Sequence, residues 1–127
     1  MNRTIEDYIN YRLERACESV EEAQLLAGNK SWNATINRLY YACFYAVTAL
    51  LLKNGAKPRT HTGTRTLFFQ KYVKTNIISK DFGNLYSDLF DWRQESDYGD
   101  FSFFDKETVL PLFDKVKTFI SVIKKQM

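Results

Sequence analysis

The stretch between Ser31 and Gly55 constrains the fold more than any other part of the chain. On a helix its apolar side chains cover more than half of the circumference, so that it must be buried on several sides. Ser31 is a candidate N-cap and Gly55 a candidate stop after Asn54. The sequence therefore predicts that this helix is the centre of a bundle. Its apolar residues are Trp32, Ile36, Leu39, Tyr40, Cys43, Phe44, Val47, Leu50 and Leu51.

Amphipathic segments on both sides of the central helix predict its neighbours. Thr4, with Asp7 three residues later, resembles a capping box and opens a helix that should end at residues 28–29. Apolar residues recur along this segment at spacings of four and three, which is typical of a helix with one buried stripe. A short helix is expected over residues 64–74, after a turn-rich loop.

Two more helices follow in the last third of the chain. Ser79 should cap one that ends at Gly99, and Asp105 should open the other, in which Pro111 lies early enough to be tolerated or to bend the helix slightly. No strand-like alternation of useful length interrupts these patterns. We predict an all-α protein, a four-helix up-and-down-like bundle with one additional short helix, formed by a single domain over residues 1–127.

Composition excludes several classes of function. Two cysteines and one histidine show no metal-ligand spacing and no disulfide framework. There is no phosphate-binding glycine loop and no serine nucleophile elbow. No apolar run approaches the length of a membrane span, and the first residues lack the apolar core of a signal peptide. We therefore expect a cytoplasmic protein without metal or cofactor that does not bind a membrane.

Charge is distributed very unevenly. The segment 23–80 contains no Asp or Glu but nine cations, whereas the rest of the chain carries the other nine cations and all 15 acids. A basic segment attracts phosphates, because their neutralisation releases counterions. The alternative is a solvated face that has no anionic partner. The cations are Lys30, Arg38, Lys53, Lys57, Arg59, Arg65, Lys71, Lys74 and Lys80.

Arg38 is unusual because it lies in the middle of the most apolar helix. A lone buried guanidinium is costly, so Arg38 needs a carboxylate, carbonyl groups, solvent or a phosphate beside it. Tyr41, Ala42 and Tyr45 should share its face and form a polar and aromatic strip. Arg38 could bind a phosphate there, or it could form a structural ion pair, most simply with Asp97.

Four segments give the chain a resemblance to a known family: 37–46 and 50–55 in the central helix, 60–63 after it, and 93–98 late in the chain. Together they resemble HEPN proteins, and the similarity covers nearly the whole chain. The resemblance implies a helical homodimer and a metal-independent ribonuclease. It also implies a toxin encoded beside a minimal nucleotidyltransferase, which acts as its antitoxin.

The active motif of that family is an arginine followed, after four to six residues, by a histidine. Arg38 matches the arginine, but the histidine positions hold Cys43, Phe44 and Tyr45. Either Tyr45 or Cys43 could replace the histidine. In the second case Tyr45 matches a tyrosine that some HEPN toxins carry and the partner enzyme modifies with AMP. Tyrosine and cysteine titrate near 10 and 8.5, too high for ready proton transfer at neutral pH.

His61 is the chain's one imidazole, and two roles are open for it. It could reach the strip of Arg38 in a dimer and supply the missing group, or it could cap the next helix through its neighbours or pack at the loop edge. Arg93 and Asp97, four residues apart, could form a helix salt bridge or support Arg38. We assign candidate roles as follows: catalytic, Arg38, Tyr45 and His61; RNA- or nucleotide-binding, Asn37, Tyr41, Lys57, Arg59 and Arg65; supporting, Arg93, Asp97 and Tyr98.

These observations favour an RNA-directed, toxin-like protein paired with a nucleotidyltransferase. Two alternatives remain open. One is a non-catalytic helical module that binds a nucleotide or a protein, and the other is a substrate-recruiting partner of the transferase. The missing histidine favours the alternatives, whereas the one-sided charge favours the RNA-directed toxin.

Overall fold

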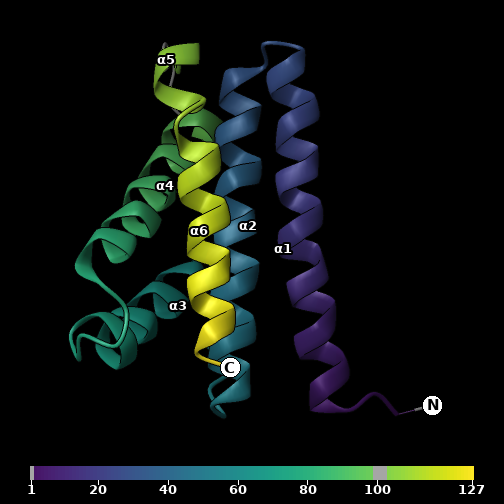
Figure 1. Ribbon diagram of the computed structural model, residues 1–127, viewed down its shortest axis with the longest axis vertical. Coiled ribbons are helices and arrows are strands. Elements are labelled where there is room, and N and C mark those ends of the chain that lie inside the picture. Colours follow the sequence, from purple (N-terminus) through teal and green to yellow (C-terminus); the bar gives the residue numbers. More distant parts are fainter. Residues whose placement is uncertain (1, 99–102) are drawn as a thin grey trace.

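The computed structural model describes residues 2–98 and 103–127, with the backbone alone for residues 96–98. All secondary structure in these ranges is helical, which confirms the predicted all-α bundle. Figure 1 shows α1, α2 and α6 side by side, with α4 inclined across α2 on the far side from α1. The elements are α1 (Ile5–Gly28), α2 (Trp32–Lys53), α3 (His61–Phe68), the π-helix η1 (Phe69–Val73), α4 (Lys80–Tyr98), α5 (Lys106–Val109) and α6 (Leu112–Lys125).

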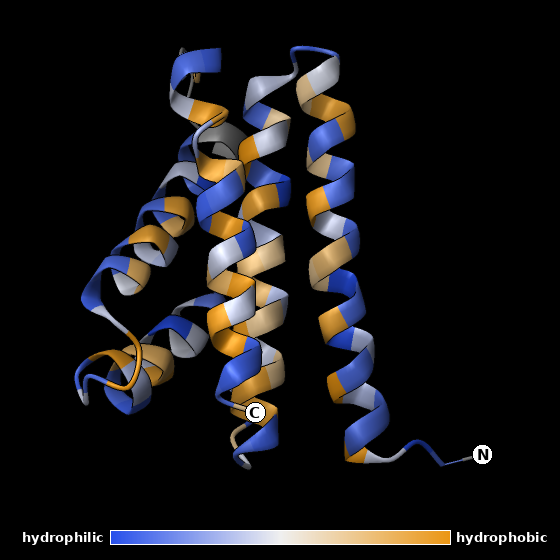
Figure 2. Ribbon diagram, in the orientation of Figure 1, coloured by the Kyte–Doolittle hydropathy of each residue, from blue (hydrophilic) through white to orange (hydrophobic). Residues whose placement is uncertain are grey.

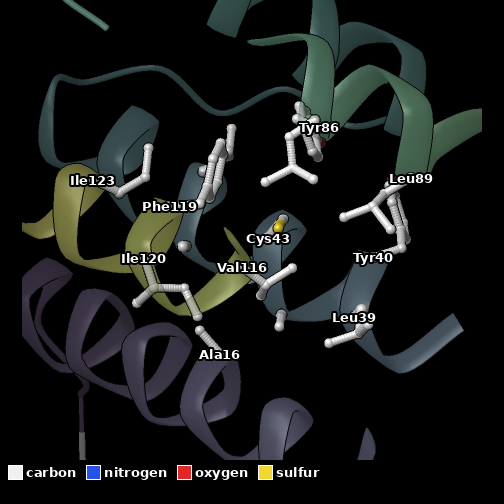
Figure 3. Close-up of a cluster of buried hydrophobic side chains, with 14 of the residues drawn as sticks. Ala16, Leu39, Tyr40, Cys43, Tyr86, Leu89, Val116, Phe119, Ile120 and Ile123 are labelled. Atoms are coloured by element: carbon white, nitrogen blue, oxygen red, sulfur yellow. The ribbon is translucent and has the colours of Figure 1, made fainter. Parts of the chain in front are cut away.

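Helix α2 is the centre of the bundle, as its sequence predicts. It contacts α1, α3, α4, α5 and α6, and hydrophobic residues run along most of its length (Figure 2). Leu39, Tyr40 and Cys43 are fully buried, and they pack with side chains of α1, α4 and α6 in one core (Figure 3). No helix among the described residues is long and apolar enough to cross a membrane.

Helices α1 and α2 form an antiparallel hairpin with a regular register. Three contacts join residues whose numbers add to 60: Glu22 with Arg38, Arg15 with Tyr45, and Arg12 with Thr48. Both helices rise about 1.5 Å per residue, so residues equally far from the turn at 29–31 lie at the same level. This register places charged residues of α1 beside the middle of α2.

The helix caps agree in part with the sequence patterns. The predicted box at the start of α1 is confirmed, because Thr4 and Asp7 exchange hydrogen bonds of 3.0 and 3.1 Å. Ser31 occupies the N-cap of α2, but its hydroxyl makes no cap hydrogen bond. Gly55 follows α2 with φ +82°, a conformation that glycine adopts without strain.

The third helix starts three residues earlier than predicted and changes type. Thr60 is its cap, since its hydroxyl accepts a hydrogen bond of 2.8 Å from the Gly63 amide. The chain then continues as η1. On α4 the aromatic residues Tyr86 and Phe90 are buried, whereas Phe82 and Trp92 are only partly buried.

The last helix is broken where the sequence predicted continuity. Helix α5 ends at Val109, Pro111 is the N-cap of α6, and α6 begins at Leu112. Proline lacks an amide hydrogen and its ring clashes with the carbonyl four residues earlier, so the helix restarts after it. Asp105 does cap α5, through its carboxylate and the Thr108 amide at 2.9 Å. The predicted end of α4 at Gly99 lies outside the described residues.

Candidate functional site

Arg38 lies on the side of α2 that faces α1, and it is partly exposed. Its guanidinium donates to the Asn37 side-chain oxygen from Nε at 3.1 Å and from Nη2 at 2.8 Å. Its Cζ lies 4.8 Å from the centre of the Tyr41 ring, within the range of a cation–π contact. Asn37 and Tyr41 thus orient Arg38, and both were predicted members of the site.

Helix α1 supplies the carboxylate partner of Arg38. Glu22 Oε1 lies 3.5 Å from Arg38 Nη1 and 3.6 Å from Arg15 Nη2. Arg15 also donates to Glu18 at 2.7 Å, and its Cζ lies 5.4 Å from the Tyr45 ring centre. The sequence analysis assigned the ion pair to Asp97, whose side chain lies outside the described residues.

The polar and aromatic strip on α2 contains fewer of the predicted residues than the helical spacing indicated. Tyr41 and Tyr45 are partly exposed, and their ring centres are 6.1 Å apart. Ala42 and Cys43 are fully buried and lie in the core instead. Burial raises the pKa of the Cys43 thiol far above its usual range. This position and pKa argue against Cys43 as the replacement for the missing histidine.

His61 reaches the aromatic residues of α2 within the same chain. Its Nδ1 lies 2.7 Å from the Tyr40 hydroxyl, and its ring centre lies 4.5 Å from that of Phe44 and 5.8 Å from that of Tyr41. His61 is therefore not a loop-edge residue; it begins α3, and its neighbour Thr60 is the cap of that helix. Arg38 and His61 both lie against the ring of Tyr41.

The protonation of the His61 cluster follows from its surroundings. Burial and the positive charge of Arg93 lower the pKa of His61, so its neutral form predominates at pH 7. Burial raises the pKa of Tyr40 to about 12, so its hydroxyl stays protonated. That hydroxyl can donate to Nδ1 or accept from it, which leaves Nε2 as the nitrogen available to a ligand.

Arg93 is part of this cluster, although the sequence predicted only a supporting role. Its side chain is buried, and its Cζ lies 4.9 Å from the Tyr40 ring centre and 6.0 Å from that of Tyr41. Two arginines thus approach the ring of Tyr41. Of the other predicted supporting residues, Asp97 and Tyr98 belong to α4, and their side chains lie outside the described residues.

The predicted RNA-binding cations lie on both sides of His61 in the sequence. Lys57 and Arg59 are exposed in the loop that leads into α3. Arg65 lies further along α3 and is only partly exposed, because its Cζ lies 3.8 Å from the Phe90 ring centre. Its Nη1 is 3.5 Å from Asp91 Oδ1. The loop cations are therefore open to an anion, and Arg65 is held by α4.

Three residues at this site were missed by the sequence analysis: Arg15, Glu22 and Tyr40. The hairpin register could have identified Arg15 and Glu22, because helices of equal rise pair residues equally far from their turn. Tyr40 was assigned to the core, and it is buried, but its hydroxyl holds His61. In the described parts of the chain, no group of three or more His, Cys, Asp or Glu residues is arranged to hold a metal.

Fold and site together define an all-α bundle whose central helix carries an oriented arginine and a tyrosine ring, Tyr41, that contacts both this arginine and an imidazole from α3. A family model described as HEPN domain matches residues 9–126, so the chain belongs to the HEPN family. A UPF0332 protein of Thermotoga maritima is 37% identical over 94% of this chain and 91% of its own length. A Methanocaldococcus jannaschii protein named "Putative toxin MJ0142" is 29% identical over 91% of this chain and 78% of its own. A UPF0332 protein of Archaeoglobus fulgidus is 28% identical over 93% and 94%.

Proposed function

We propose that this protein is an RNA-directed toxin of a toxin–antitoxin pair and that it cleaves RNA without a metal, using Arg38 and His61. The observation that supports this most is the position of both side chains against the Tyr41 ring. His61 comes from α3 instead of α2, and it would replace the histidine that the family motif carries on the same helix as its arginine. Two relatives from Methanocaldococcus jannaschii, whose names are "Putative toxin MJ0142" and "Putative toxin MJ0605", support the toxin part of the proposal.

The chemistry of such a cleavage uses the 2′-hydroxyl of RNA, which attacks the adjacent phosphorus while the bond to the 5′-oxygen breaks. In the tautomer whose Nδ1–H donates to the Tyr40 hydroxyl, His61 Nε2 would take the proton of the 2′-hydroxyl, and the imidazolium so formed, or a water, would give a proton to the leaving 5′-oxygen. Arg38 would bind the phosphate oxygens and stabilise their negative charge in the transition state. An imidazole with a lowered pKa is neutral at pH 7 and can therefore act as the base.

The exposed cations beside His61 would bind the RNA backbone. Lys57 and Arg59 lie in the loop that leads into α3, which begins at His61, and neither forms an ion pair among the described residues. Each phosphate contact that is lost should reduce the slope of log K against log salt by about 0.7 for single strands. Reversal of both charges should lower both affinity and slope, whereas an unchanged slope would mean that the loop is only a solvated face.

The homodimer and the antitoxin partner belong to the same proposal. Tyr8 and Tyr11 are exposed aromatic residues of α1, and Tyr11 precedes Arg15 by one helical turn. A second copy that covered these rings would place two Arg38 sites near one interface. Light scattering should show a dimer, and a nucleotidyltransferase encoded beside this chain should co-purify with it. A monomer at tens of micromolar would contradict the dimer.

A non-catalytic binding module is the second candidate, and one observation favours it. Glu22 already occupies one side of the Arg38 guanidinium, which is what a structural arginine requires. Incubation of the protein with RNA in the presence of EDTA distinguishes the metal-independent ribonuclease from the non-catalytic binding module. Arg38→Ala and His61→Ala should each lower the cleavage rate by about 10²- to 10⁴-fold. Arg12→Ala, which removes another α1–α2 contact, should not.

Two results of that assay would contradict the proposal. If the wild-type protein does not cleave RNA, the non-catalytic module stands. If Tyr45→Phe abolishes cleavage while His61→Ala leaves it intact, then the tyrosine of α2 transfers the proton, and the assignment of His61 is wrong.

A further inference from the structure

A hollow of about 300 Å³ opens between α4 and the α3–η1 segment. It contains none of the residues that hold Arg38 or His61. Two of its six lining residues are cations and none is a carboxylate, which distinguishes it from most of the surface of α4. The lining residues are Arg65, Thr66, Phe69, Gln70, Lys74 and Ser87.

The chemistry of this lining matches a nucleotide. Arg65 and Lys74 can bind phosphate oxygens, and the amide of Gln70 and the two hydroxyls can bond to a sugar or a base edge. Phe69 is only partly buried, so part of its ring is available for stacking. Cations beside an exposed aromatic ring are the combination by which proteins bind single-stranded nucleic acid.

The fold holds the hollow in shape through close packing of α4 on η1. A Cβ at Gly83 would lie 3.0 Å from Val73 Cγ1 and 3.2 Å from Phe69 Cε1, so only glycine lets α4 approach this closely without displacing them. The phenylalanine begins η1, a π-helical turn of a kind that is frequent at functional sites. The close packing of α4 therefore holds the Phe69 ring, the aromatic side chain that lines the hollow, in place.

Arg65 is preorganised and still able to bind an anion. Its Cζ lies over Phe90 at 3.8 Å, and its Nη1 lies 3.4 Å from Ser87 Oγ and 3.5 Å from Asp91 Oδ1. The Asp91 side chain is 61% exposed, and ion pairs of this length and exposure are weak. A phosphate could take over the guanidinium without leaving a carboxylate buried.

The hollow also lies close to the proposed catalytic site. Arg65 follows His61 by four residues on α3, so the two side chains lie on the same face about one turn apart. Phe90 contacts both the hollow and the catalytic site. Its ring lies under Arg65, and its ring centre is 6.0 Å from that of Tyr40, whose hydroxyl bonds to His61. A strand with its reacting phosphate at His61 would have a neighbouring nucleotide at the hollow.

We propose that the hollow is a subsite for one nucleotide of single-stranded RNA, with its phosphate on Arg65 and Lys74 and its base against Phe69. The assignment to RNA rests on the proposed function, whereas the affinity for a nucleotide does not. Calorimetric titration of the full chain with 5′-AMP, adenosine and inorganic phosphate tests the affinity. Titration with a short oligoadenylate at several salt concentrations tests the assignment.

Matched variants locate the bound nucleotide. Lys74→Gln should weaken 5′-AMP binding about tenfold, as expected for the loss of a charge-assisted hydrogen bond, and should lower the salt slope for oligoadenylate by about 0.7. Lys71→Gln removes an exposed lysine of η1 that does not line the hollow, and it should change neither. Phe69→Leu should weaken 5′-AMP but not phosphate.

Each contrary result overturns a defined part of the proposal. Unchanged 5′-AMP binding by Lys74→Gln would place the nucleotide elsewhere. Phosphate that binds as tightly as 5′-AMP would remove the role of the base. A Lys74-dependent affinity for 5′-AMP without any affinity for oligoadenylate would overturn the assignment to RNA. A wild-type protein that binds oligoadenylate through Lys74 but does not cleave RNA would refute the catalytic proposal and leave the subsite intact.

Discussion

Removal of the Arg38 guanidinium should cost this protein little stability, because its ion pair is long and both side chains are partly exposed, although Glu22 Oε1 itself is buried. The side chains of Arg38 and Glu22 are 26% and 44% exposed, and the closest atoms are 3.5 Å apart. Such a pair contributes at most about 1 kcal/mol, and the contact with the Tyr41 ring adds about 0.5 to 1 kcal/mol. Arg38→Ala should therefore lose about 1 to 2 kcal/mol, a decrease in Tm of about 4 to 8 °C for a chain of this size.

A double-mutant cycle measures the ion pair separately from the ring contact. Arg38→Ala, Glu22→Gln and the double variant would be unfolded in urea and followed by circular dichroism, with Arg38→Lys as the control that keeps the charge. The coupling energy between the two positions should not exceed about 1 kcal/mol and should decrease in high salt. A coupling of about 3 kcal/mol or more would refute this reasoning, because that value belongs to a buried pair whose loss strands a charge.

The same variants have a consequence for RNA. Glu22 Oε1 lies 3.5 Å from Arg38 Nη1, so Glu22→Gln removes a negative charge that competes with an RNA phosphate, and it should raise the affinity for RNA by several-fold at low salt. Arg38→Ala should lower the affinity, and the double variant should bind as weakly as Arg38→Ala does. If Glu22→Gln leaves the affinity unchanged, the phosphate does not compete with this carboxylate, and Arg38 does not bind RNA.

Three further predictions test other parts of the structure. Because the pKa of His61 is lowered in the folded protein, the unfolded chain binds a proton on this imidazole more readily. The free energy of unfolding should therefore decrease as the pH falls below about 6.5. His61→Gln should reduce this decrease in thermal melts recorded at several pH values. Gly83→Ala should lower the free energy of unfolding in urea by about 1 kcal/mol, because the new methyl group crowds η1 by more than the gain in helix propensity offsets. In the control Gly28→Ala the new methyl group meets no atom within 4 Å, so the free energy of unfolding should not decrease. A thiol reagent should modify Cys17 but not the buried Cys43 in the native protein, and both after denaturation.

Local signals in the sequence were sufficient for much of the fold. The capping box of Thr4 and Asp7 depends only on residues three apart, and it fixed the start of α1. The apolar residues of α2 required burial on several sides, and that helix is the centre of the bundle. The break at Pro111 was underestimated, since the sequence does not show whether packing will hold a helix together across a proline.

The candidate site depended on arrangements that periodicity does not encode. The seven residues 54–60 must return along the last nine residues of α2, about 14 Å, to place His61 beside Phe44. Nothing in their composition gives that direction. The partner of Arg38 was in principle accessible, because Glu22 is its counterpart in the hairpin register, but a register is known only after two helices are known to be neighbours.

The charge network around Arg38 bears on whether a structural arginine can also bind RNA. A buried arginine with a single carboxylate cannot leave it without stranding a charge. Here Glu22 lies almost equally close to Arg15, at 3.6 Å, and to Arg38, at 3.5 Å. If Arg38 turned towards a phosphate, Glu22 would keep a cationic partner, and Arg15 would keep Glu18 at 2.7 Å. The carboxylate on α1 therefore competes with a phosphate for Arg38, but it is not stranded when the phosphate binds; it can hold the guanidinium in place until an anion replaces it.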